Sequence, residues 1–374
     1  MKKHLLLTFG VLTILTLFCQ QISAKIWRVN NRSNYNGSTL YGDNFGGTAS
    51  YPVFAQINQV VAFGIVNSGD TLHVEGSTTT YDFSTITKRL VIIGTGYFLT
   101  ENPNVSNTVL QSNLARIVFN PGSEGSQIIG INMISAGNSS DRDIYINVNG
   151  IVVKRCRIEG QIVFGFPLTD VYLIQNFFPA ISAVNVFATN GNSFFVPPTD
   201  IIFNNNICQR SLTWGSPLVT PANYWPILQC NNNVFDGPDN LATPNLAFST
   251  SEFRGNILIP TNAKVALQAS AGVIVYNIGT MSTQFGTENN NIVVPAIATL
   301  FKPSTSTDGA YQIAPGTQAN NSSYDGTDRG AFGGAITNRY TLSGLANIPD
   351  VYKVTTSGVG NGSINVIIEA RTIK

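Results

Sequence analysis

Two aspartates are the residues whose spacing best suits chemistry. Asp170 and Asp200 each stand six positions before an asparagine, Asn176 and Asn206. If those asparagines stack in adjacent coils of the chain, the two carboxylates lie at one level, about 5 Å apart. Such a pair would recruit a cation such as calcium, and the separation also suits a retaining glycosidase. The alternative is that each aspartate opens a strand after a turn. We favour it, because no other coil carries an acid at this level.

Lys154, Arg155 and Arg157 form the densest basic cluster, one coil before Asp170. Such a cluster could hold an acidic sugar, and Lys154 or Arg157 could serve as the base of a lyase. The alternative is solvated surface, which is the usual state of charges on an exposed strand. We therefore keep Lys154, Arg157 and the aspartates as catalytic candidates only for the case that the protein is an enzyme.

Aromatic residues are concentrated in two long insertions between coils. Trp214, Tyr224 and Trp225 lie within residues 211–226, and Phe194 and Phe195 lie within residues 192–198. Loops that project from a rigid scaffold often form binding surfaces. Because aromatic rings stack on sugar faces, Trp214, Tyr224 and Trp225 are candidate carbohydrate-binding residues. Packing of these rings against the outside of the scaffold is the open alternative.

Groups that catalysis usually needs are scarce. His73 is the only histidine left once a leader is removed, and we interpret it as structural because it lies in an apolar strand. The sequence has no Asp-Asp pair and no Gly-His-Gly motif, which argues against histidine acid–base chemistry. Asp325, Asp328 and Gly330 have part of the pattern of a calcium loop, but further ligands and a trailing glutamate are missing, so we interpret them as a turn.

The elements that must position these residues form a repeat. Seven short hydrophobic segments, twenty to thirty residues apart, each lead into one key residue, usually asparagine: Asn132, Cys156, Asn176, Asn206, Asn233, Asn256 and Asn277. The positions three before and two after the key residue are almost all apolar, so they face a core. We expect a strand, a turn at the asparagine and a second strand in each coil. Asparagine tolerates the left-handed conformation, and stacked amides could bond along the axis as a ladder. Short β-branched runs with scattered Gly and Pro argue against a helical repeat.

Further stretches outside the repeat carry a resemblance to a known family. They are Ile57–Ala62, Gly69–Val74, Lys88–Gly96, Tyr311–Gly316 and Asp325–Gly334. With the repeat, they resemble the right-handed parallel β-helix proteins of the pectate-lyase-like superfamily, in its secreted bacterial branch. The resemblance covers roughly Ile26 to Gly334 and implies an all-β solenoid whose last coil includes the final two stretches. Family lyases use clustered acidic ligands with an Arg or Lys base, and family hydrolases place several aspartates on adjacent coils. This chain departs from both patterns.

The two ends of the chain predict export and an extension. Residues 1–24 have the charged start, the apolar stretch and the small residue before a cleavage site of a secretory signal peptide, with cleavage after Ala24. A membrane anchor would need about 20 apolar residues, more than this stretch has. We assign residues 25–336 to the β-helix and residues 337–374 to a C-terminal extension or cap. A strand at Ser363–Ala370 would close the end of the stack, or the tail would serve in sorting or anchoring.

Three cysteines remain after leader removal. Cys208 and Cys230 fall in different inward columns, and Cys156 falls at the turn position, so we expect buried free thiols. Cys208 with Cys230 is the one disulfide worth testing.

Composition limits the partners of the exported chain. Removal of Lys2 and Lys3 reduces the 21 basic residues to 19 against 20 acidic ones, and only 11% of residues are charged. A nucleic-acid binder would show a basic excess. We expect a secreted or cell-surface monomer without membrane insertion and without a cofactor other than calcium. The first hypothesis is a non-catalytic scaffold that binds carbohydrate or a cell-surface polymer. The second is a polysaccharide lyase or glycoside hydrolase.

Overall fold

The structure is a computed structural model that describes residues 24–32, 48, 51–102, 109–135, 141–165, 167–181, 185–190, 196–216, 223–239, 244–357 and 365–372. These residues are nearly all β, with most strands in three parallel sheets. The few helical segments are α2 (Ile57–Ala62), α3 (Ser282–Phe285), η2 (Ile297–Leu300), η3 (Gly309–Tyr311) and η4 (Leu342–Gly344).

Sheet A has thirteen strands: β1 (Ile26–Val29), β2 (Val53–Phe54), β3 (Thr71–Val74), β5 (Val91–Ile93), β8 (Gln127–Ile129), β11 (Val152–Lys154), β14 (Val171–Ile174), β17 (Ile201–Asn204), β19 (Leu212–Thr213), β22 (Pro226–Gln229), β24 (Pro244–Arg254), β26 (Lys264–Gln268) and β27 (Ile274–Val275). Sheet B has nine: β6 (Asn113–Leu114), β9 (Asn132–Met133), β12 (Arg157–Ile158), β15 (Phe177–Phe178), β18 (Ile207–Cys208), β23 (Val234–Phe235), β25 (Ile257–Leu258), β28 (Ile278–Gly279) and β29 (Ile292–Val293). Sheet C has five: β4 (Ser84–Ile86), β7 (Ile117–Phe119), β10 (Ile144–Ile146), β13 (Ile162–Phe164) and β16 (Phe187–Thr189).

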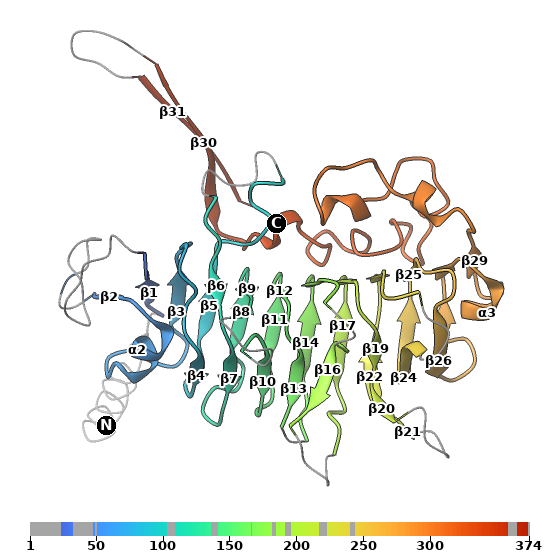
Figure 1. Cartoon of the computed structure of the whole chain (residues 1–374), viewed down its shortest axis with the longest axis horizontal. Coiled ribbons are helices and arrows are strands. Elements are labelled where there is room, and N and C mark those ends of the chain that lie inside the picture. Colours follow the sequence, from blue (N-terminus) through green and yellow to red (C-terminus); the bar gives the residue numbers. More distant parts are fainter. Residues whose placement is uncertain are drawn as a thin grey trace, which may run out of the picture.

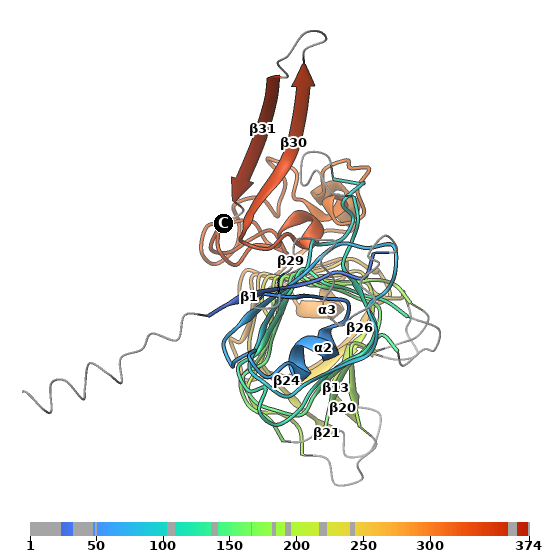
Figure 2. The same ribbon diagram turned by 90° about the vertical axis from the view of Figure 1, so that its left-hand side faces the viewer.

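The chain visits the three sheets in turn. One coil runs through β11 in sheet A, β12 in sheet B and β13 in sheet C before β14 returns to sheet A. Strands of successive coils pair in parallel, with Val153 beside Leu173 and Leu173 beside Phe203. Figure 1 shows these strands side by side along the long axis, and Figure 2 looks along the stack. The prediction of an all-β chain with long parallel sheets is confirmed.

Inward-facing side chains form the core because side chains alternate between the two faces of a strand. Along sheet A the buried column contains Ile92, Ile128, Val153, Leu173, Phe203 and Phe253. The Phe203 ring stacks on its neighbours, with ring centroids 5.6 Å from Phe178 and 6.4 Å from Phe235. Burial of each large apolar side chain contributes about 1.5–3 kcal/mol, so the stack of coils is held mainly by this column and its equivalents.

Buried asparagines form the expected ladder at the corner between sheets A and B. Each side-chain Nδ2 donates to the Oδ1 of the asparagine one coil later, at 3.0–3.1 Å. The same Oδ1 also accepts the backbone N–H of the earlier asparagine, at 2.8–2.9 Å. The ladder runs through Asn176, Asn206, Asn233, Asn256, Asn277 and Asn291. Asn291 therefore adds a step beyond the repeat read from the sequence.

In the structure the first repeat is shifted by one residue relative to the alignment that the sequence predicts. Arg157 pairs with Asn132 in sheet B, so Ile131, and not Asn132, lies at the level of Cys156 and the ladder. Asn132 instead donates to the Asn113 side chain at 2.8 Å. Both alignments place apolar residues in the inward columns, Ile129 and Ile134 in one and Ile128 and Met133 in the other, so the sequence pattern does not distinguish them.

The residue with the left-handed backbone conformation lies one position earlier in the turn than the sequence predicts. Positive φ angles occur at the residue before the ladder position, with φ 54° at Arg155, 61° at Gln175 and 56° at Asn205. We call these positions the A–B corner: Gly130, Arg155, Gln175, Asn205, Asn232, Gly255, Tyr276 and Asn290. The asparagine after the corner is thus free to point inward and bond along the stack.

The C-terminal part of the chain returns along the A–B corner. We name residues 328–347 the strap. Asn205 donates to the backbone oxygens of Ala331 and Gly333 at 3.0 and 2.9 Å, and Gln175 donates to those of Thr337 and Arg339 at 3.2 and 2.6 Å. In Figure 1 the orange and red segment lies along one side of the stack. Corner side chains thus serve as the donors that hold the strap.

The C-terminal elements differ from two expectations. Sheet B ends at β29, and residues 311–316 and 325–334 add no strand to the three sheets, so they are not a last coil. A strand near Ser363–Ala370 is present as β31 (Asn365–Thr372), but it pairs antiparallel with β30 (Pro349–Ser357) and not with the end of the stack. Figures 1 and 2 show this hairpin projecting from the body. Because β31 pairs only with β30, it does not cap the sheets as expected. The domain limits at 25, 336 and 374 stay predictions.

Candidate functional site

A groove on sheet A is the best candidate for a binding site. Its volume is about 410 Å³, and we call it the sheet A groove. It is lined by Thr199, Pro226, Ile227, Leu228, Ser249, Thr250, Ser251, Gln268, Ala269 and Ser270. None of these lining residues carries a charge. The groove therefore offers hydroxyl and amide groups beside the apolar surfaces of Pro226 and Leu228.

Strand register explains why a hollow forms here. Ser249 of β24 pairs with Pro226 of β22 on one side and with Gln268 of β26 on the other. Paired strands lie about 4.8 Å apart, so the three strands span roughly 10 Å. The small side chains of Ser249 and Ser251 on the central strand leave room between the larger residues beside them. The lining of the groove has no nucleophile paired with a base.

Two of the three aromatic candidates adjoin the groove. Trp225 and Tyr224 directly precede Pro226, and both are half-buried. The backbone of Trp225 accepts a hydrogen bond from Ser249 at 3.0 Å. Tyr224 lies on β21 (Asn223–Tyr224), which pairs antiparallel with β20 (Gly215–Ser216). The Trp225 ring packs against the core and against Trp214, so only its partly buried edge is open to solvent. Phe194 and Phe195 lie outside the described residues.

Trp214 is placed differently from the expectation. Only 2% of it is exposed, and its ring packs in the core against Phe164, Phe187 and Trp225, with centroids 5.1, 5.2 and 4.7 Å away. We expected it on a projecting loop, but an insertion between coils can carry its aromatic residues inward. Trp214 therefore supports the position of Trp225 and offers no surface of its own to a ligand.

Asp170 and Asp200 lie at one level of adjacent coils, as their spacing predicts. The register pairs Val171 with Ile201, the residues that follow them. Each carboxylate accepts a hydrogen bond from the threonine before it, at 3.2 Å for Thr169 and 3.0 Å for Thr199. Asp170 is exposed with φ 58°, and Asp200 is half-buried. Both positions fit the interpretation as turn residues that open a strand, and Asp200 adjoins the sheet A groove through Thr199.

The turn between sheets A and B separates the residues of the basic cluster. Lys154 ends β11 in sheet A, whereas Arg157 begins β12 in sheet B and bonds to Glu159 at 2.7 Å. Arg155 between them is 1% exposed, which corrects its expected place on an exposed strand. Its Nε donates to Gln175 at 2.7 Å, and its Nη1 donates to the Leu345 carbonyl of the strap at 2.7 Å. Burial lowers the pKa of Arg155 to about 10.

Lys154 and Asp170 do not converge on one point. Lys154 pairs with Ile174, four residues further along β14 than Asp170, a separation of roughly 13 Å along the strand. Burial, together with the charge of Arg155, lowers the pKa of Lys154. A base is thus present on sheet A, but no acid stands beside it at its level.

A buried polar cluster beside the strap was missed from the sequence. Asp308 is fully buried and accepts hydrogen bonds from Asn102 at 2.8 Å and from the Ser343 N–H at 2.7 Å. Tyr340 bonds to Asp308 at 3.3 Å and to Tyr97 at 2.7 Å. Burial raises the pKa of Asp308. The bonded residues are up to 243 positions apart, so no local pattern could indicate this cluster, which fastens the strap to the loop after β5.

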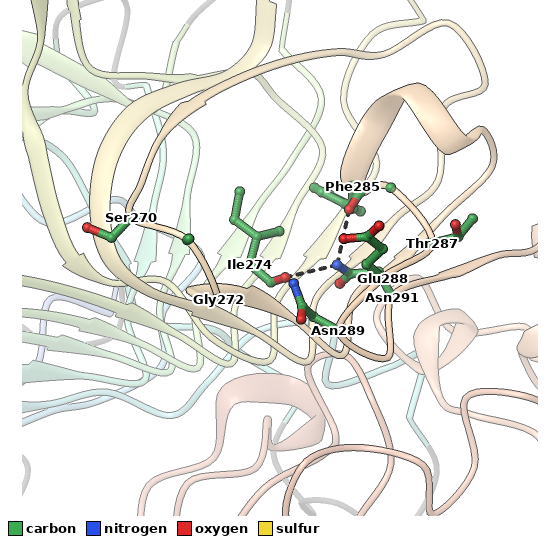
Figure 3. A pocket seen from close by; sticks show the side chains of 10 residues that line it. Ser270, Gly272, Ile274, Phe285, Thr287, Glu288, Asn289 and Asn291 are labelled. Atoms are coloured by element: carbon green, nitrogen blue, oxygen red, sulfur yellow. Dashed lines mark hydrogen bonds between the residues drawn. The ribbon is translucent and has the colours of Figure 1, made fainter.

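A second hollow of about 410 Å³ lies at the far end of the stack. Figure 3 shows Asn291, the last ladder residue, donating to the Ile274 and Phe285 carbonyls beside it. These bonds end the ladder, because Asn291 has no later asparagine in the ladder to meet. Glu288 is the only charged residue among those that line this hollow. We therefore assign these residues to the end of the fold.

The three cysteines are buried free thiols, as predicted, and no Cys208–Cys230 bridge forms. Burial raises the pKa of Cys156 to about 12 and that of Cys208 to about 11. It also lowers the pKa of His73, which lies in β3 between the coils of Arg28 and Ile93. These groups are therefore neutral at physiological pH.

Asp325 and Asp328, which have part of the pattern of a calcium loop, form turns in the structure. Asp325 accepts a hydrogen bond from the Thr327 hydroxyl at 2.7 Å, and Asp328 accepts one from Asn320 at 2.8 Å. Within the described residues no three His, Cys, Asp or Glu side chains gather as a metal site would require.

Comparisons with known proteins leave the family open. No helix in the described part of the chain is long and apolar enough to span a bilayer. No family model matches the sequence, and neither the curated proteins nor the solved structures include a match.

Proposed function

We propose that the chain is an exported, non-catalytic scaffold that binds a neutral carbohydrate or a cell-surface polymer in the sheet A groove. We further propose that its three sheets form a closed right-handed parallel β-helix of the pectate-lyase-like kind. Strands that visit three parallel sheets in turn support this architecture. Export rests on the leader pattern of residues 1–24, and the absence of a basic excess argues against nucleic acid.

The observation that carries the binding proposal is the uncharged lining of the groove. Ser251 and Gln268 are exposed there, and Leu228 supplies apolar surface beside them. Neutral sugars present hydroxyl groups on an apolar ring, so they match such a lining better than an acidic polymer does. We propose that Tyr224, half-buried two residues before Pro226, stacks on a sugar face.

A binding experiment tests this proposal. We would measure affinity for immobilised glucan, xylan and mannan, with pectin and alginate as acidic polymers, using the protein that starts at Lys25. Ser251→Arg places a long charged side chain in the groove and should weaken binding about tenfold. Ser357→Arg, on the exposed hairpin, is the matched control and should bind as the parent does. Equal affinity of both variants, or binding of acidic polymers alone, would contradict the proposal.

The second candidate is a polysaccharide lyase or glycoside hydrolase, and the lowered pKa of Lys154 is the observation that favours it. A calcium ion at Asp170 and Asp200 would supply the electrophile of a lyase. Incubation with the same polymers, with and without calcium, should yield unsaturated products or reducing ends if this candidate is correct. Loss of that turnover in Lys154→Ala and Asp170→Ala would replace the binding proposal, and Arg157→Ala would show whether sheet B takes part.

A further inference from the structure

Asp70 is a buried carboxylate at the start of the stack. It is 1% exposed and directly precedes β3. Its Oδ2 accepts hydrogen bonds from the Trp27 indole N–H at 2.7 Å and from the Asn67 N–H at 2.9 Å. Its Oδ1 accepts the backbone N–H of Lys25 at 2.9 Å. Two of the three donors therefore come from the first residues of the described chain.

The three groups that donate hydrogen bonds to this carboxylate are all neutral. The ion pairs within the described residues do not include Asp70. Arg89 lies on the next coil, but its guanidinium approaches Gly69 and forms no ion pair with Asp70. A buried charge with neutral partners alone is costly, and a paired one is stabilised.

The donor on Oδ1 is the nitrogen that the expected leader cleavage would release. Hydrolysis of the Ala24–Lys25 bond breaks the C–N bond and adds water: the water oxygen leaves Ala24 as a carboxylate, and both water hydrogens end on the Lys25 nitrogen, which becomes an α-ammonium. Ala24 is exposed, and Lys25 is held at the edge of sheet A, where its carbonyl accepts the Thr71 N–H at 2.8 Å. The new charge would therefore arise 2.9 Å from the Asp70 carboxylate without movement of the chain.

We propose that leader removal after Ala24 creates a partly buried ion pair between the Lys25 α-ammonium and Asp70, which stabilises the first coil. The inference rests on the export part of the proposed function and is independent of polymer binding. Trp27 lies beside the pair, fully inside the core, and contacts Phe54 and Phe63 at 6.2 Å between ring centroids. Cleavage thus adds stability to the aromatic packing that closes this end of the stack.

A double-mutant cycle on two N-termini tests the pair. One protein starts at Lys25, and the other keeps three native residues and starts at Ile22, which moves the amine away from Asp70. The equilibrium constant of unfolding in guanidinium should be about tenfold smaller for the Lys25 start. With Asp70→Asn in both proteins, that difference should vanish. Equal stability of the two parents, or a difference that survives Asp70→Asn, would overturn the proposal.

A second measurement covers the case that Asp70→Asn does not fold. The α-amine of the Lys25 start should react several-fold more slowly with an acylating reagent than the α-amine of the Ile22 start, because an ion-paired ammonium is a poor nucleophile. Equal rates would count against the pair. Mass spectrometry of the exported full chain should give Lys25 as its first residue, and any other start would overturn the processing step. Polymer binding can fail without affecting any of these outcomes.

Discussion

Asn206→Ala should strongly destabilise the stack. The Asn206 side chain takes part in four buried hydrogen bonds. Nδ2 donates to the Leu173 carbonyl at 2.9 Å and to Asn233 Oδ1 at 3.1 Å. Oδ1 accepts the backbone and side-chain N–H groups of Asn176 at 2.9 and 3.1 Å. At about 1 kcal/mol net for each bond, the substitution should lower the free energy of unfolding by about 4 kcal/mol.

Asn204→Ala, at the end of β17 and two residues before Asn206, is the matched control. Asn204 is half-buried and points outward, where its Oδ1 accepts the Asn231 N–H at 2.8 Å. Its Nδ2 makes a longer bond to Gln229 at 3.4 Å. The expected loss is about 1 kcal/mol.

Guanidinium unfolding, followed by circular dichroism and tryptophan fluorescence, gives both free energies by linear extrapolation once refolding is shown to be complete. If Asn206→Ala costs no more than Asn204→Ala, the ladder does not hold adjacent coils together and the reasoning is refuted.

Three further substitutions test other contacts. Cys156→Asn should add a ladder step to Asn176 and raise the free energy of unfolding by about 1 kcal/mol, because Cys156 already bonds Asn176 through its backbone at 3.0 Å; a decrease in the same guanidinium assay would contradict this. Gln175→Ala should speed amide hydrogen exchange in the strap alone, measured by mass spectrometry, since two of the bonds that hold the strap are lost; unchanged strap exchange would be the contrary result. Burial raises the pKa of Asp308, so the folded state binds more protons than the unfolded state, and stability should fall as pH rises from about 4 through the raised pKa. Asp308→Asn should flatten that decline in unfolding measured across pH, and a slope equal to the parent's would contradict the assignment.

The sequence predicted the stack where the spacing within each repeat is constant. From Asn176 to Asn256 a buried residue stands three positions before each ladder asparagine, so counting from Asn176 and Asn206 also placed Asp170 beside Asp200 correctly. At Asn132 the same counting failed, because neighbouring isoleucines permit two registers. A ladder asparagine is recognisable in the sequence because it is a polar residue within an apolar pattern. A run of apolar residues contains no such distinct residue, so it does not define the register.

The contacts of the strap and the lining of the groove could not be predicted in the same way. Gln175 and Asn205 look like ordinary turn residues, and their partners in the strap are more than 120 positions away. The sheet A groove arises from small residues on strands that are adjacent only after folding, such as Ser249 and Ser251 of β24 beside β22 and β26. Trp214 has the composition of a surface loop around it and lies in the core. Each of these features depends on which coils are neighbours, which only the complete stack determines.

The asparagine ladder has a polarity. Each Nδ2 from Asn176 to Asn277 donates one of its hydrogens to the asparagine Oδ1 of the next coil, so these amide–amide bonds all run in one direction and each bond polarises the next. Such a row is strongest in its interior and weakest at its two termini. Thermal opening should therefore begin at Cys156 or Asn291 and progress inward. Loss of an asparagine at an end of the row should lower the free energy of unfolding far less than loss of one in the middle.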